Sequence, residues 1–67
     1  MIGHNVFLEF MKKVEKRDGS TEEWYDVKEV YADDEVEAVI LSLAKILEMS
    51  NMGYVLTRVK HTIVKEY

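Results

Sequence analysis

The chain contains no cysteine and no proline, and only three of its residues are glycine. Without cysteine it can form neither a disulfide framework nor a thiolate metal site, and this absence favours a reducing cytoplasm. A long apolar run is also missing: the longest, 38–43, contains Ser42 and is far shorter than the roughly 20 residues that span a membrane. Because no basic segment leads into an apolar one at the N-terminus, we expect no signal peptide and a cytoplasmic location.

Length and composition predict one small globular domain, residues 1–67. A chain of 67 residues has no room for a second core. Its hydrophobic content of 48% and charged content of 33% are ordinary for a folded protein and argue against disorder. The net charge of -4 disfavours sequence-independent binding to nucleic acid as the main activity.

The charge is unevenly distributed along the chain. Residues 22–37 contain eight acids and a single lysine, whereas the C-terminal part is mildly basic. The acids that we assign to an acidic surface are Glu29, Asp33, Asp34 and Glu37. Such stretches are usually solvated faces that keep a small protein soluble.

Hydrophobic patterning predicts two strands joined by a hairpin. Residues 5–16 begin with an almost continuous apolar run, which is typical of a strand with neighbours on both edges. Asp18-Gly19 is a strong hairpin signal, because glycine tolerates the positive φ of such turns. The strand expected over 22–32 alternates imperfectly, which indicates a β-bulge or two partly covered faces.

A helix follows, with clear signals at both ends. Asp33 or Asp34 can cap it, and the acids of its first turn complement the helix dipole. Gly53 can end it in a left-handed turn, with Asn51 as the alternative. Its apolar residues recur at helical spacing and predict one broad stripe: Val36, Val39, Ile40, Leu43, Ile46 and Leu47.

The last strand is expected over 54–65. Alternation places Val55, Val59 and Ile63 on the face that meets the helix. The opposite face then carries Leu56, Arg58, Lys60, Thr62 and Val64. The cations of this face, Arg58 and Lys60, project side by side, roughly 7 Å apart.

The element order is therefore ββαβ, and the fold class is α+β. A right-handed crossover makes the third strand parallel to the second and places it beside the first. We expect a three-stranded antiparallel sheet of order 2-1-3, with the helix packed on one face and the other face uncovered.

The sequence shows no arrangement suited to catalysis, a metal or a cofactor. We expect His4 to lie in a frayed N-terminus and His61 to pack at the periphery of the last strand. No metalloprotease motif, glycine-rich phosphate loop or EF-hand loop is present. We predict a protein that is not an enzyme, that has no cofactor, and that acts by binding another macromolecule.

Three kinds of binding remain open. In protein recognition, Arg58 engages a partner carboxylate bidentately and Lys60 adds a point charge, unless both are paired with Glu9, Glu15 or Asp26. A homodimer would instead join the uncovered sheet faces through Phe7, Met11, Leu56 and Val64. A weak single-stranded RNA binder would use Tyr54, Arg58 and Lys60, although the acidic second strand repels phosphate.

Two stretches of the chain resemble a known family. They are Val30-Tyr31-Ala32 continuing through Glu37-Ala38, and Gly53-Tyr54-Val55-Leu56-Thr57-Arg58-Val59-Lys60. Both are similar to the small RNA polymerase inhibitor of T-odd coliphages, a chain of similar length with the same ββαβ order. The resemblance covers roughly residues 30–64, and between the two blocks this chain is about one helical turn longer.

The resemblance implies a non-catalytic bacteriophage inhibitor that binds the host's multisubunit RNA polymerase in the bacterial cytoplasm. Family members dock on the jaw of the largest subunit, at the rim of the downstream DNA channel. Two basic residues of the last strand make the essential contacts, and they correspond here to Arg58 and Lys60, within a block that also holds Tyr54, Leu56 and Thr57.

The resemblance also gives the uneven charge a role. The acidic side would lie toward the DNA channel and the mobile N-terminal region of the sigma factor, so that promoter melting fails. Two positions depart from the family pattern: Lys60 stands in place of an arginine and loses bidentate geometry, and His61 replaces a proline.

Overall fold

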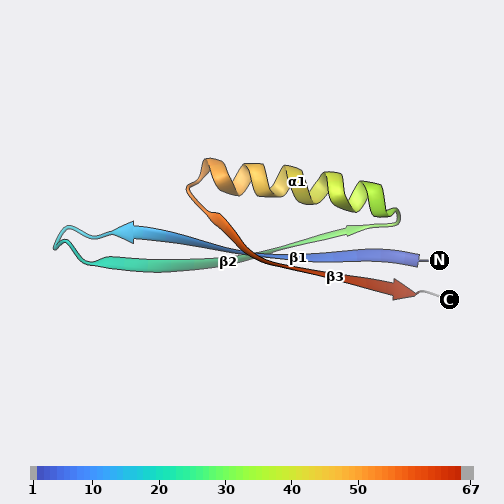
Figure 1. The fold of residues 1–67 in the computed structure, drawn as a ribbon, viewed down its shortest axis with the longest axis horizontal. Coiled ribbons are helices and arrows are strands. Elements are labelled where there is room, and N and C mark those ends of the chain that lie inside the picture. The colour runs from blue at the N-terminus through green and yellow to red at the C-terminus, as the bar shows by residue number, and fades with distance from the viewer. Residues whose placement is uncertain (1, 66–67) are drawn as a thin grey trace.

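A computed structural model describes residues 2–65, and they follow the predicted order ββαβ (Figure 1). The elements are β1 (Ile2–Glu15), β2 (Thr21–Ala32), α1 (Glu35–Asn51) and β3 (Val55–Lys65). Both β2 and β3 pair antiparallel with β1. The predicted three-stranded sheet of order 2-1-3 is therefore confirmed, with α1 lying along one face of it.

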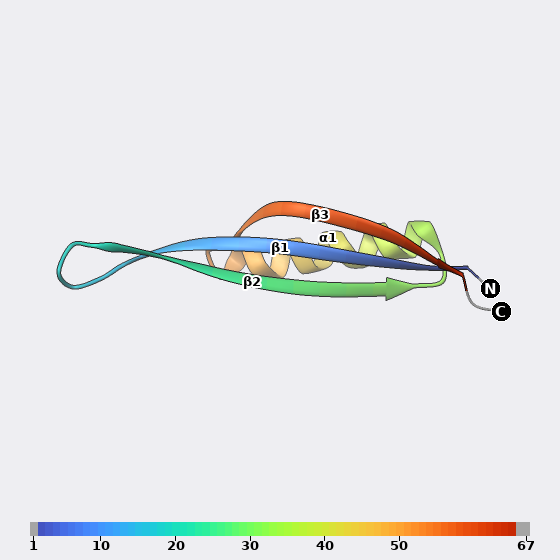
Figure 2. The same ribbon diagram turned by 90° about the horizontal axis from the view of Figure 1, so that it is seen from below.

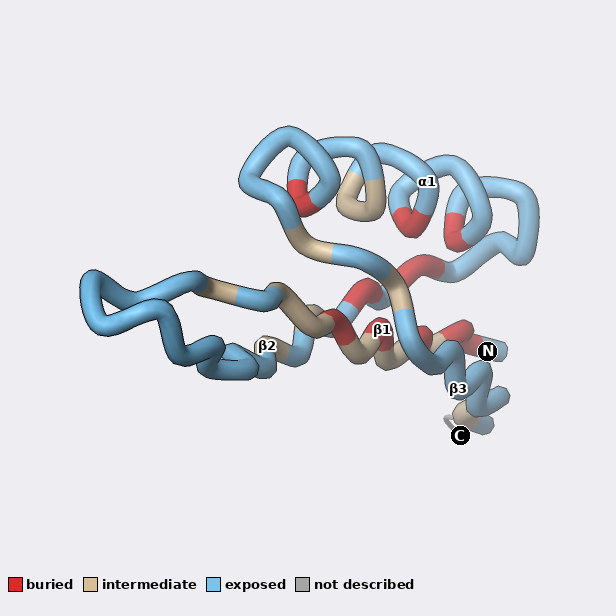
Figure 3. The backbone as a smooth tube through the Cα atoms, turned by 60° about the vertical axis from the view of Figure 1, so that its left-hand side comes forward, coloured by how far each residue is buried: buried red, intermediate tan, exposed pale blue. Residues whose placement is uncertain are grey.

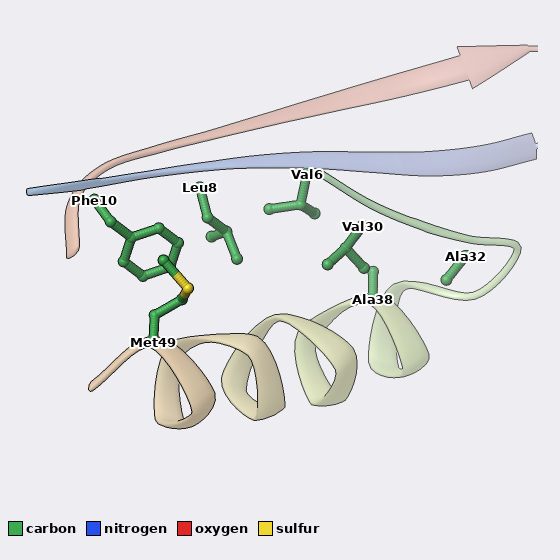
Figure 4. Close-up of a cluster of buried hydrophobic side chains, with 7 residues drawn as sticks. All are labelled: Val6, Leu8, Phe10, Val30, Ala32, Ala38 and Met49. Atoms are coloured by element: carbon green, nitrogen blue, oxygen red, sulfur yellow. The ribbon is translucent and has the colours of Figure 1, made fainter. Parts of the chain in front are cut away.

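The central strand β1 supplies the middle of the core. Its side chains alternate between the two faces, and on the α1 side Val6, Leu8 and Phe10 are 6%, 0% and 1% exposed. The core is completed by residues of β2 and α1 (Figure 4): Val30, Ala32, Ala38 and Met49. This core is small and narrow, because the sheet contributes to it mainly through β1 and the last residues of β2.

The hairpin of β1 and β2 is long and extends past the end of α1 (Figure 2). The molecule measures 55 × 18 × 12 Å as a result. At its tip Gly19 has a φ of 86°, and Ser20 donates to Asp18 Oδ1 through both its amide and its hydroxyl. The strands pair without a register shift from His4 opposite Ala32 to Glu15 opposite Thr21, so a bulge in β2 is ruled out.

The predicted ends of the helix are confirmed. Asp34 is the N-cap, and its Oδ1 accepts from the amide of Val36 at 2.7 Å. At the other end Gly53 has a φ of 87°, and its amide donates to the carbonyl of Ser50. The left-handed conformation that only glycine adopts without strain thus turns the chain toward β3.

The predicted apolar stripe, however, is mostly not packed against the sheet. The buried residues of α1 are Ala38, Ser42 and Met49, and of the stripe only Ile46 packs against the core. The others are more than half exposed: Val36, Val39, Ile40, Leu43 and Leu47. Ala38 and Ser42 instead line, together with Val39 and Leu43, a groove of about 200 Å³ between α1 and the strands β1 and β3.

A β-bulge in β3 corrects a second expectation. The register shifts between Glu9 and Phe10, so Arg58 pairs with Glu9 but Leu56 pairs with Phe10, and Thr57 is the extra residue. Because one added residue reverses the alternation, Leu56 packs against the core and Val55 is 59% exposed. The prediction that Val55 meets the helix and that Leu56 shares a face with Arg58 is wrong.

The expectation of a frayed His4 is also wrong. This residue lies within β1 and is buried, with its Nδ1 2.9 Å from Nε2 of His61. The two rings stack with centroids 5.1 Å apart. His61 pairs with Val6 and so lies on the α1 side of β3, as predicted.

Candidate partner-binding site

The site lies on the face of the sheet that α1 does not cover, here called the open face. Arg58 and Lys60 project from this face of β3, opposite Glu9 and Phe7 of β1. Both cations are exposed, and the Arg58 side chain retains 66% of its accessible surface. Arg58 and Lys60 therefore lie side by side on one face of β3, as their spacing predicts.

A shallow depression of about 270 Å³ lies between these cations and the neighbouring strands. Its walls are Phe7, Glu9, Val27, Arg58 and Lys60. Phe7 and Val27 are apolar and come from β1 and β2, so the cations border a surface that can also make apolar contacts. Sequence reasoning did not assign Val27 to the site, although the register set by the hairpin turn places it opposite Glu9.

The charges of the site are only weakly compensated within the molecule. Arg58 Nε lies 4.0 Å from Glu9 Oε2, and both side chains are largely exposed. Exposed pairs of this kind contribute about 0–1 kcal/mol. Within residues 2–65, Lys60 forms no ion pair, and neither Glu15 nor Asp26 pairs with either cation, since Asp26 contacts Lys28 instead.

The other three predicted binding residues have different surroundings. Thr57 is exposed at the bulge, where its hydroxyl donates to the carbonyl of Glu9 at 3.1 Å. Tyr54 packs against the core, and its ring lies 5.6 Å from Nζ of Lys12. Leu56 also packs against the core. The structure therefore groups Arg58 and Lys60 with Thr57 nearby, and separates Tyr54 and Leu56 from them.

The predicted acidic surface is divided. Glu29 lies on the open face opposite Phe7, which separates it from Lys60 by one strand, and it accepts from Asn5 Nδ2 at 2.6 Å. Asp33, Asp34 and Glu37 instead surround the N-terminal end of α1, where Asp34 is the cap. The predicted acidic residues therefore lie in two separate places: Glu29 on the β2 part of the open face, and the other three at the N-terminal end of α1.

The open face also bears on the predicted homodimer. Phe7, Met11 and Val64 remain on it and are half-buried, but Leu56 has moved to the other side of the sheet. What is left is interrupted by Glu9, Arg58 and Lys60. The predicted homodimer surface therefore loses Leu56, while Val27 and Tyr25 add exposed apolar surface to the same face.

Asp18 and Tyr25, whose pKa values are shifted, lie in the hairpin and do not line the depression beside Arg58 and Lys60. Tyr25 donates its hydroxyl hydrogen to Glu23 Oε2, and this bond, with the negative charge of Glu23, raises the pKa of Tyr25 above 10.0. The hydrogen bonds from Ser20 lower the pKa of Asp18 below 3.8. Both groups are exposed, and their hydrogen bonds are local: that of Asp18 lies within the hairpin turn and that of Tyr25 within β2.

Within residues 2–65, no cluster of three or more histidine, aspartate or glutamate side chains could hold a metal ion. In the same part of the chain, α1 lacks the length and apolarity to cross a membrane. Comparisons of the chain with protein-family models, with curated proteins and with solved structures find no match.

Proposed function

We propose that this chain is a non-enzymatic phage protein that binds bacterial RNA polymerase and blocks transcription initiation. One observation carries the binding role: Arg58 and Lys60 stand together, exposed and weakly compensated, beside an apolar depression on an uncovered sheet face. The nature of the partner rests on the resemblance of residues 30–64 to the inhibitors of T-odd coliphages.

The chemistry of the open face fits an acidic protein surface. The planar guanidinium of Arg58 can bind a carboxylate bidentately, and Lys60 adds a second positive charge close by. Phe7 and Val27 offer apolar area between the cations and β2. A charged anchor beside apolar side chains, which lose their water when a partner covers them, is the arrangement found at the centre of many protein interfaces.

The acidic residues limit the choice of partner. Glu29 lies on the same face as Lys60, one strand away, so phosphate approaching the cations would also meet a carboxylate. A nucleic acid presents a phosphate at every nucleotide, whereas a protein can place single carboxylates opposite the two cations and away from Glu29, so this arrangement favours a protein partner. Asp33, Asp34 and Glu37 add negative charge at one end of the molecule, which fits a position near a DNA channel, as the resemblance implies.

The proposal is tested with purified RNA polymerase from an enteric bacterium, by calorimetry and by a promoter-dependent transcription assay. Arg58→Glu should weaken binding at least ~30-fold, because loss of one partner of a buried interface charge pair costs about 2–5 kcal/mol. Its melting curve should stay close to that of the parent chain, since the side chain is 66% exposed.

The chain has one other arginine, Arg17, which is exposed at the hairpin and provides the matched control. Arg17→Glu makes the same charge change and should leave binding and inhibition intact. Equal affinity of the Arg58→Glu variant and the parent would refute the anchor. Retention on single-stranded RNA that falls steeply with salt, without polymerase binding, would show an RNA-binding protein instead.

A further inference from the structure

The two histidines of the chain meet on the α1 side of the sheet, although 57 residues separate them. His4 of β1 pairs with Ile63 of β3, so His61 is its diagonal neighbour on the same face. Diagonal neighbours in an antiparallel pair are about 7–8 Å apart, which long side chains can bridge. Here Nδ1 of His4 lies 2.9 Å from Nε2 of His61. The strand register therefore brings one nitrogen of each ring together.

The separation of these two nitrogens suits a shared metal ion. Imidazole nitrogens bind transition metals at about 2.0–2.1 Å, so two of them at a right angle around one ion lie about 2.9 Å apart. Right angles between neighbouring ligands are typical of square-planar or tetragonal Cu²⁺ and Ni²⁺ sites. A tetrahedral ion would need about 3.4 Å between the same nitrogens. The spacing therefore favours Cu²⁺ or Ni²⁺ over Zn²⁺.

Both nitrogens are able to act as ligands. In the hydrogen bond that joins the rings, one neutral imidazole donates and the other accepts. The donated hydrogen can instead occupy the second nitrogen of its own ring, which frees both facing nitrogens for a metal. Neither ring has to lose its hydrogen to solvent for this exchange.

An ion can reach the pair from the β3 side. His4 is only 9% exposed, but His61 is an exposed residue. Figure 3 shows the start of β1 buried and most of β3 exposed. His61 also lines the groove of about 200 Å³ between α1 and the strands. Water can therefore fill the coordination positions that the two rings leave open.

Negative charge gathers at the same end of the molecule. Ala32, the last residue of β2, pairs with His4, and α1 begins three residues later. Glu35 lines the groove together with His61. The acids at this end are Asp33, Asp34, Glu35 and Glu37. The ion pairs within residues 2–65 involve other carboxylates. Four carboxylates exceed the roughly half unit of positive charge at a helix N-terminus, so this end attracts cations.

We infer that His4 and His61 bind one divalent transition-metal ion of the Cu²⁺ or Ni²⁺ type. A closed structural site needs four protein ligands, and residues 2–65 offer no cluster of three. The histidine pair is therefore an open site that water completes. A bound ion joins the start of β1 to the end of β3 and so stabilises this end of the sheet. The inference does not depend on the proposed function, because Arg58 and Lys60 project from the opposite face.

Calorimetry with Ni²⁺ tests the site, on a chain prepared without a histidine tag. The parent should bind one ion per chain. His61→Ala should weaken binding at least ~10-fold, since even the loss of a residue that only orients a ligand costs about 10–100-fold. The matched control is Thr62→Ala: Thr62 pairs with Asn5 on the open face, and the variant should bind as the parent does.

Two further measurements connect the binding to the histidine pair. Ni²⁺ should raise the melting temperature of the parent and of Thr62→Ala, but not that of His61→Ala. With Cu²⁺, electron spin-echo modulation should detect two coordinated imidazoles in the parent and one in His61→Ala. The chain has no other histidine, which makes this count unambiguous.

Four results would overturn the inference. Equal affinity of the parent and His61→Ala would show that the pair is not the site. A single coordinated imidazole in the parent would exclude the shared ion. Half an ion per chain would mean that the metal bridges two copies. Displacement of Ni²⁺ by Mg²⁺, which prefers oxygen ligands, would assign the ion to the acids of α1 instead.

Discussion

Phe7 and Phe10 are the same residue type on the same strand, yet they do different things. Phe10 points toward α1 and is 1% exposed in the core, whereas Phe7 points to the open face and borders the depression beside Lys60. The comparison applies to the whole sheet: the α1 side contributes stability, and the open face offers contacts to a partner. Substitutions on the two faces should therefore separate folding from binding.

Phe10→Ala should have the largest effect on folding. Removing a fully buried phenylalanine side chain costs about 3–5 kcal/mol, which is a large part of the stability of so small a domain. Urea denaturation followed by circular dichroism measures it. Phe7→Ala should cost far less, because that side chain is only half-buried, and it should weaken partner binding instead. A similar loss of stability in both variants would contradict the division between the faces.

The start of α1 should show the next largest effect. Asp34→Ala removes the acceptor of the Val36 amide and should cost about 1 kcal/mol, the typical value for an N-cap. Asp33→Ala is the control, because it also removes one negative charge before the helix but leaves the Asp34 carboxylate that accepts from Val36. The difference between the two variants in urea midpoint isolates the cap. If Asp33→Ala were as destabilising, the loss would come from charge alone.

The fold could be predicted because its signals are local or set by chain direction. Asp18-Gly19 and Gly53 mark turns that need a positive φ, and both glycines adopt one. The near-continuous apolar run of β1 indicates a strand with two neighbours, and the handedness of the crossover then determines the order of the sheet. None of these inferences requires knowledge of side-chain packing.

The rotation of α1 could not be predicted, because periodicity identifies an apolar stripe but not what covers it. Ala38 and Ser42 face the sheet together with Met49, although hydrophobicity alone ranks Ala38 and Ser42 below Leu43 and Leu47. Most of the stripe therefore lies on the exposed side of α1, and periodicity does not distinguish that side from the buried one.

The bulge in β3 was missed for a similar reason. Thr57 fits a regular strand as well as its neighbours do, and only the pairing with β1 reveals it as an extra residue. Arg58 and Lys60 lie beyond the bulge and share the predicted face, whereas Leu56, before it, does not. The shared face of Arg58 and Lys60 could therefore be predicted from their spacing, because both follow the bulge. The face of Leu56 could not, because the bulge lies between Leu56 and Arg58.

Glu9→Gln should leave stability nearly unchanged and improve binding. The Arg58 contact that it weakens is 4.0 Å long and exposed, so the free energy of unfolding should change by less than about 0.5 kcal/mol. The carboxylate that competes for Arg58 is removed, and affinity for an acidic partner should rise a few-fold. Calorimetry measures this affinity, and Glu15→Gln, which makes the same change in the hairpin, is the control. Weaker binding would mean that Glu9 itself contacts the partner.

The smallest effect concerns Tyr25, which lies on the open face beside Val27 and bonds to Glu23. The folded state raises the pKa of Tyr25 above its ordinary value of 10.0, so its contribution to stability is complete below pH 10. As the pH rises through the higher pKa of the folded state, the hydroxyl loses its hydrogen, the bond to Glu23 breaks, and the contribution disappears.

Tyr25→Phe isolates this contribution from the titration of other groups. The stability difference between the parent and Tyr25→Phe, measured by urea denaturation, should be constant below pH 10 and shrink above it. Glu23→Gln should bring the tyrosinate absorbance of Tyr25 back toward the ordinary titration range. A parent chain whose advantage over Tyr25→Phe grows above pH 10 would contradict the bond, since ionisation can only remove a hydrogen that Tyr25 donates.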